Sequence, residues 1–143
     1  FRNRLFNIFS LNKFSLNEVK AKNLDNLFNE AVFLNSPKYK MILNKKMKHN
    51  IRLKKIKYPE TGGVKVEIRH QYTPIEISRK LVKIGFSIEN IYPINLHLIN
   101  PKIKNHKVIN DLKKKSLKIY NDINFGSLIS QSSTFMILAK KIK

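Results

Sequence analysis

Cysteine and tryptophan are absent from this 143-residue chain, and glycine is scarce. Without cysteine, the protein has no disulfide framework, no thiol nucleophile and no thiolate zinc site. Four glycines, at positions 62, 63, 85 and 126, cannot form a Gly-x-Gly-x-x-Gly nucleotide loop. No apolar run approaches the roughly 20 residues that a membrane-spanning helix needs, and no signal peptide opens the sequence. We therefore expect a cytoplasmic protein without a transmembrane segment.

Acidic residues are scarce as well: nine Asp and Glu stand against 29 Lys and Arg, so the formal net charge is +20. A charge of this size is typical of nucleic-acid binding. Only five of the cations are arginine, although arginine suits phosphate groups and guanine edges best. The lysines are spread along the chain among many Asn and Ile residues, as AT-rich codons would produce. A nucleic-acid partner and attraction to a membrane surface both stay open, and neither is favoured.

Apolar side chains make up 42% of the residues, which is enough for one globular unit with a hydrophobic core. Ser15 and Glu18 form a capping-box pattern, which predicts a helix over 16–33. Ser36-Pro37 predicts a second helix that runs to about residue 48. The apolar stripe of the first helix would consist of Val19, Leu24, Leu27, Phe28, Ala31 and Val32.

The second half of the chain alternates strand and helix signals. Thr73, Pro74 and Glu76 combine an N-cap, a proline at the first helical position and a capping box, and Gly85 provides a helix stop. Around this helix we expect an extended segment at 64–69, a strand from Phe86 to about Leu98, a basic helix at 105–120 and a last strand at 134–138. This order is typical of the end of a larger α/β sheet.

Three stretches in fixed order carry a resemblance: FRNRLF and FSLNKFS within residues 1–15, HQYTP at 70–74 with GFSIE at 85–89, and SSTFMILAKK at 132–141. Together they resemble the C-terminal part of class I S-adenosylmethionine-dependent methyltransferases. In that family they would be the segment after the fifth strand, the helix with the sixth strand, and the antiparallel seventh strand. The resemblance implies the C-terminal part of a Rossmann-like α/β fold that ends in an antiparallel strand pair. It places a helical cap at 1–59 and the closing helix and strands at 60–143.

The resemblance also implies an activity. The chain would be the acceptor-selecting part of a transferase that moves a methyl group from S-adenosylmethionine to a small-molecule, lipid or sugar acceptor. The glycine-rich loop and the acidic residue that hold the cofactor in this family are missing from the chain. We therefore expect a missing N-terminal half to bind the cofactor, and the chain alone to bind none and to be inactive. The alternative is a small basic nucleic-acid-binding or ribosome-associated protein without catalysis.

Five residues are candidates for the site. His70 precedes a helix N-terminus, where it would act as a general base or bind substrate; a loop histidine paired with backbone groups is the alternative. Tyr72 would pack over a substrate or staple the start of the helix. The resemblance places Arg2 and Asn3 at the active site, and Asn12 would polarise a substrate or cap a turn. The histidine spacing matches no metal motif, so no metal site is expected.

Overall fold

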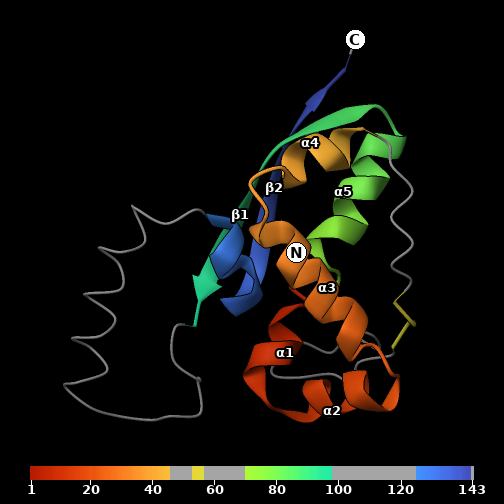
Figure 1. Ribbon diagram of the computed structural model, residues 1–143, viewed down its shortest axis with the longest axis vertical. Helices are drawn as coiled ribbons and strands as arrows, with labels where there is room; N and C mark the ends of the chain where they lie inside the picture. Colours follow the sequence, from red (N-terminus) through yellow and green to blue (C-terminus); the bar gives the residue numbers. More distant parts are fainter. Residues whose placement is uncertain (46–52, 57–69, 98–124, 143) are drawn as a thin grey trace, which may run out of the picture.

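A computed structural model of the chain describes residues 1–45, 53–56, 70–97 and 125–142 (Figure 1). In chain order, the elements are α1 (Phe6–Ser10), α2 (Lys13–Lys20), α3 (Leu24–Asn35), α4 (Tyr39–Asn44), α5 (Pro74–Lys83), β1 (Phe86–Leu96), the 3-10 helix η1 (Phe125–Gln131) and β2 (Ser132–Lys141). The fold therefore mixes helices and strands, as predicted. The extended segment expected at 64–69 and the helix expected at 105–120 lie outside the described residues.

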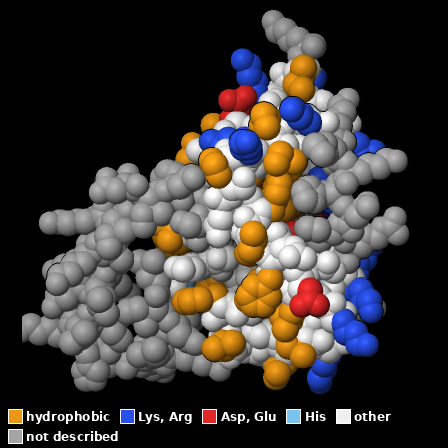
Figure 2. Space-filling view, viewed as in Figure 1, with side chains coloured by type: hydrophobic (Ala, Val, Ile, Leu, Met, Phe, Trp, Pro, Cys, Tyr) orange, Lys and Arg blue, Asp and Glu red, His pale blue; other side chains and the backbone are white. Residues whose placement is uncertain are grey.

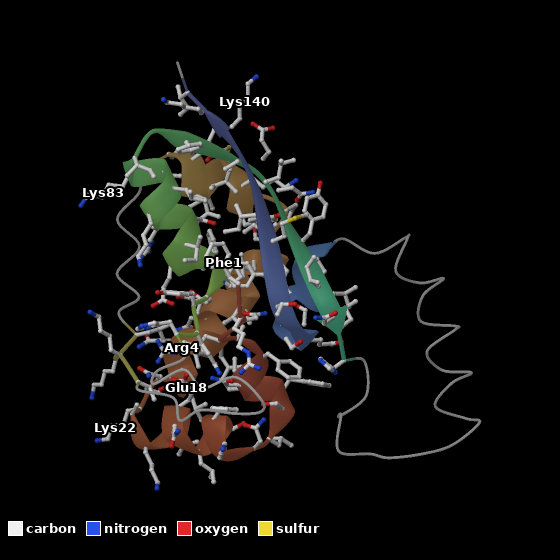
Figure 3. All side chains as sticks on the ribbon, turned by 180° about the vertical axis from the view of Figure 1, so that it is seen from behind. Phe1, Arg4, Glu18, Lys22, Lys83 and Lys140 are labelled. Atoms are coloured by element: carbon white, nitrogen blue, oxygen red, sulfur yellow. The ribbon has the colours of Figure 1, made fainter. Side chains whose placement is uncertain are left out.

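β1 and β2 form a two-stranded antiparallel sheet, which confirms the antiparallel strand pair predicted for the end of the chain. Ile91 pairs with Ile137 and Pro93 with Phe135, and the register shifts between Ile88 and Asn90. A two-stranded sheet is marginal by itself. Its stability therefore depends on the helices that cover one of its faces, which lie behind the sheet in Figure 3.

The hydrophobic core lies between this covered face and the helices. It is formed by Leu5, Leu27, Leu34, Tyr39, Leu43, Ile75, Ile77, Val82, Ile88, Ile91, Ile129 and Phe135. The other face of the sheet carries partly exposed apolar side chains at Ile94, Met136 and Leu138. The alternation follows from the two-residue period of a strand, which points successive side chains to opposite faces.

Helix α5 begins and ends where the sequence predicts. The Thr73 hydroxyl accepts from the Glu76 backbone N–H at 3.2 Å, and the Glu76 carboxylate accepts from the Thr73 backbone N–H at 2.8 Å. Pro74 occupies the first helical position. Gly85 follows the helix with a φ of +91°, a left-handed conformation that glycine adopts at little cost. The chain then enters β1 directly.

The single helix predicted over 16–33 is wrong, because the chain forms α2 and α3 with a break between them. Asn12, not Ser15, caps the first of these helices, and Ser15 is the third helical residue of the capping box. The break falls at Lys22, which has a left-handed φ of 55°. Asn23 holds the break in place, since its buried side chain bonds both Glu18 and the Lys54 backbone.

The predicted apolar stripe is also partly wrong. Val19, Phe28 and Val32 are exposed, with 51%, 51% and 69% of their surface accessible. Helix α3 instead buries Leu27, Glu30 and Leu34, so a carboxylate takes a place on its inner face. The helix predicted from Pro37 begins later, at Tyr39, and Pro37 precedes it.

Candidate functional site

A pocket of about 290 Å³ lies where α1 and the start of α2 meet the ends of β1 and β2. Three of the five predicted site residues, Arg2, Asn3 and Asn12, line it. Phe6 and Phe14 supply aromatic surface, and Ser10, Gln71 and Asn95 supply polar groups. The structure thus brings together residues from both ends of the sequence.

Asn3 is buried and fixes the wall of this pocket. Its side-chain amide donates to the backbone carbonyls of Ile129 and Ser132, and its side-chain oxygen accepts from the Leu5 N–H at 3.1 Å. These bonds join the N-terminal segment to the end of η1 and the start of β2. Both ends of the Asn3 amide are therefore used within the protein.

Asn12 caps α2 and also lines the pocket. Its side-chain oxygen accepts from the Phe14 N–H at 2.8 Å, and its backbone N–H donates to the Ser15 hydroxyl at 3.0 Å. The Ser15 hydroxyl in turn donates to the Asn7 carbonyl at 2.6 Å, which ties α2 to α1. Of the two roles expected for Asn12, the structure shows the cap. A role in binding substrate stays a prediction.

Sequence reasoning did not identify the buried ionic network behind this pocket. Arg4 donates to both carboxylate oxygens of Glu18, at 2.7 and 2.9 Å, and the two side chains point toward each other in Figure 3. Asn7 and Asn23 donate to the same carboxylate at 3.2 and 2.9 Å. Asn7 also donates to Gln71 at 2.9 Å. Because Asn7 and Gln71 both line the pocket, the network holds two pocket side chains in place.

His70 and Tyr72 lie at a second pocket, of about 410 Å³, which Gln71 shares with the first. The two rings are stacked with their centroids 6.1 Å apart, and the Lys80 ammonium lies 4.9 Å from the centre of the Tyr72 ring. The Phe1 and Tyr72 rings meet edge-on, with their centroids 6.3 Å apart. His70 is exposed. The predicted catalytic residue therefore does not share a pocket with Arg2, Asn3 and Asn12.

A buried carboxyl group lies near the second pocket. The pKa of Glu30 is raised from 4.5 to about 7, mainly by burial and to a smaller extent by the Glu76 carboxylate. A hydrogen bond with Thr73 and the positive charges of Arg79 and Arg4 act in the opposite direction. One Glu30 oxygen has no hydrogen-bond partner among the described residues. Near neutral pH, Glu30 is thus divided between its charged and neutral forms.

The described surface does not carry one continuous basic patch on the face seen in Figure 2. Lys and Arg side chains lie there in separate groups, with apolar side chains between them. Nucleic-acid binding needs many cations on one face, so the described part of this face gives the nucleic-acid alternative no support. Within the described ranges, no three His, Asp or Glu side chains could hold a metal ion together. No helix of those ranges is long and apolar enough to cross a bilayer.

Comparison of the chain with protein-family models, curated proteins and solved structures gives no match. The assignment of a function therefore depends on the strand arrangement and on the two pockets.

Proposed function

We propose that this chain is the C-terminal, acceptor-selecting part of an S-adenosylmethionine-dependent methyltransferase with a Rossmann-like sheet. In this proposal another half of the enzyme holds the cofactor. The chain completes the sheet and encloses the methyl acceptor. The acceptor is a small molecule, and the pocket lined by Arg2, Asn3 and Asn12 binds it.

The observation that carries the proposal is the position of β2 between two segments that run opposite to it. On one side it pairs antiparallel with β1. On the other side, residues 1–3 pair antiparallel with it: Phe1 and Phe135 exchange two backbone hydrogen bonds of 2.9 Å, and the Asn3 N–H donates to the Ser133 carbonyl at 2.9 Å. Residues 1–3 and β1 therefore run in the same direction.

These strand directions support the proposal, because the resemblance implies a seventh strand that is antiparallel to the others. Residues 1–3 would continue from the fifth strand, β1 would be the sixth strand, and β2 would be the antiparallel seventh strand. The proposal accounts for the backbone pairing of residues 1–3, which are otherwise too few to be a strand of their own. It also places Arg2 and Asn3 at the end of a sheet strand, where ligands of open α/β sheets bind.

The cofactor itself does not suit the first pocket of this chain. No Asp or Glu is among the described residues that line the first pocket, so a ribose would find no carboxylate there. Glycine-rich phosphate or nucleotide loops are missing from the sequence. The contribution of this chain is to bind and orient the acceptor, since methyl transfer needs the attacking atom to be held close and in line.

Binding of S-adenosylmethionine tests the proposal. The 143-residue chain and the polypeptide encoded by the complete reading frame around it are each titrated with the cofactor by calorimetry. We expect no binding by the chain and micromolar binding by the longer polypeptide. Micromolar binding by the chain alone would contradict the proposal. It would also be contradicted if the longer polypeptide bound no cofactor.

A further inference from the structure

The pocket lined by Arg2, Ser10 and Asn12 has the size and the chemistry to discriminate between ligands. Its volume of about 290 Å³ lies at the lower end of the range for small-molecule sites. Walls come from α1, the start of α2 and the ends of both strands, so the lining does not belong to one loop. A ligand of this pocket must therefore be small.

Ser10 provides an observation that points to a ligand. Its side chain lines the pocket and is only 2% exposed, but its hydroxyl oxygen has no hydrogen-bond partner among the described residues. Buried hydroxyl groups nearly always have a partner, because water no longer solvates them. A group bound in the pocket would supply the missing partner.

The backbone on two sides of the pocket has an unusual conformation. Leu11, between the pocket residues Ser10 and Asn12, has a left-handed φ of 46°. Asn95, which also lines the pocket, has a left-handed φ of 53°. A leucine rarely adopts this conformation, because its Cβ approaches a backbone carbonyl. Strained backbone of this kind gathers at binding sites, where it places neighbouring side chains.

The lining also indicates which ligand would fit. Arg2 is the only charged side chain among the described lining residues. Arginine binds a carboxylate with two parallel hydrogen bonds. Phe6 and Phe14 present aromatic surface, and the Phe6 ring is backed by the His97 ring at 4.9 Å. Aromatic side chains of this kind stack with flat rings.

We propose that this pocket binds a small planar molecule that carries a carboxylate, with Arg2 and Ser10 as donors and Phe6 and Phe14 against the ring. That such a molecule is the methyl acceptor rests on the proposed function. The binding chemistry does not rest on it, because it follows from the pocket residues alone.

Binding of three simple probes to the full chain tests the inference. Benzoate is flat and anionic, benzamide is flat and neutral, and cyclohexanecarboxylate is anionic but not flat. By ligand-observed NMR at physiological ionic strength, we expect benzoate to bind with a dissociation constant of about 1 mM. The two comparison probes should bind at least about fivefold more weakly, because each lacks one of the two interactions. Equal binding of all three probes, or no binding of benzoate, would overturn the inference.

Two variants assign the binding to this pocket. Ser10→Ala should weaken benzoate binding about tenfold, because a hydrogen bond to a charged group is lost. It should leave the melting temperature of the free protein unchanged or higher, since a buried hydroxyl without a partner is removed. Arg2→Gln should also weaken binding about tenfold. Lys20→Gln removes one exposed charge outside the pocket and is the control.

Each result has one interpretation. If Lys20→Gln weakens binding as much as Arg2→Gln does, benzoate responds only to the general charge of the protein, and the inference fails. If Ser10→Ala binds benzoate normally, the hydroxyl does not contact the ligand, and the inference fails in that form. If benzoate binds as expected but the polypeptide encoded by the complete reading frame binds no cofactor, the pocket is confirmed and only the methyltransferase proposal fails.

Discussion

The buried carboxyl group of Glu30 predicts how the stability of the protein depends on pH. Glu30 lies on the inner face of α3 with 1% of its surface exposed, and burial raises its pKa from 4.5 to about 7. Between these two values the folded protein holds a proton that the unfolded chain has released. Unfolding therefore releases a proton in this window, and the free energy of unfolding falls as the pH rises.

The size of the effect follows from the shift. Each pKa unit corresponds to about 1.4 kcal/mol, so Glu30 should cost the folded state about 3 kcal/mol above pH 7 and nothing well below pH 4.5. Glu30→Gln carries no titrating group, and its amide can keep the hydrogen bond to Thr73. From pH 4.5 to pH 7, the free energy of unfolding of Glu30→Gln should therefore rise by about 3 kcal/mol relative to that of the native protein.

Urea unfolding, followed by circular dichroism at several pH values across this window, measures the difference. Asp25→Asn is the matched control, because it removes one carboxylate from the exposed first turn of the same helix. Its difference from the native protein should change far less over the same range. A constant difference between Glu30→Gln and the native protein across the window would refute the reasoning, since it would mean that Glu30 is solvated.

Three further changes test the described packing by urea unfolding. Gly85→Ala should destabilise the fold by about 1 kcal/mol through the backbone conformation alone, because an added Cβ would meet nothing within 4 Å. Asparagine tolerates a positive φ better than alanine, so Gly85→Asn should destabilise the fold less. Equal destabilisation by both variants would contradict this explanation. Arg4→Met should cost about 3–5 kcal/mol by leaving a buried carboxylate unpaired, and Glu18→Gln added to it should restore part of that loss. Ile91→Ala should cost about 2–5 kcal/mol, whereas Ile84→Ala, at a side chain 66% exposed, should cost much less; similar losses would place Ile91 outside the core.

Local signals in the sequence predicted helix α5 and the two described strands well. The capping box at Thr73 and the stop at Gly85 depend on residues within or next to one helix, and in the folded protein these residues keep their local partners. Both strands place apolar side chains on the covered face at several positions, which favours one pairing apart from the register shift between Ile88 and Asn90. These are elements whose local preferences and tertiary packing agree.

The N-terminal helices were less predictable, because distant partners decide them. Ser15 and Glu18 have the spacing of a capping box, but the buried Arg4 takes the Glu18 carboxylate. Asn12 then provides the competing cap three residues before Ser15. Asn23 ends the helix early by bonding Glu18 and the backbone of Lys54, which is 31 residues away in the sequence. Helix propensity is a weak preference that such contacts override.

The five candidate residues do not lie together: Arg2, Asn3 and Asn12 line one pocket, and His70 and Tyr72 line another. Their role in a functional site stays a prediction. Ser10 was not selected, because a serine in an aromatic-rich segment carries no binding pattern of its own. Ser10 is of interest because its buried hydroxyl has no hydrogen-bond partner among the described residues, and no sequence pattern indicates this.

The three residues at positions 2–4 divide stability and binding between them, and this division decides which variants can test the site. Asn3 bonds the backbone of η1 and β2, and Arg4 neutralises Glu18 in the interior. Changes at either residue should unfold the protein before they report on a ligand. Arg2 is exposed at the pocket and Ser10 contributes no described side-chain hydrogen bond. A loss of binding in an Arg2 or Ser10 variant can be attributed to the pocket when urea unfolding shows that the variant keeps the stability of the native protein.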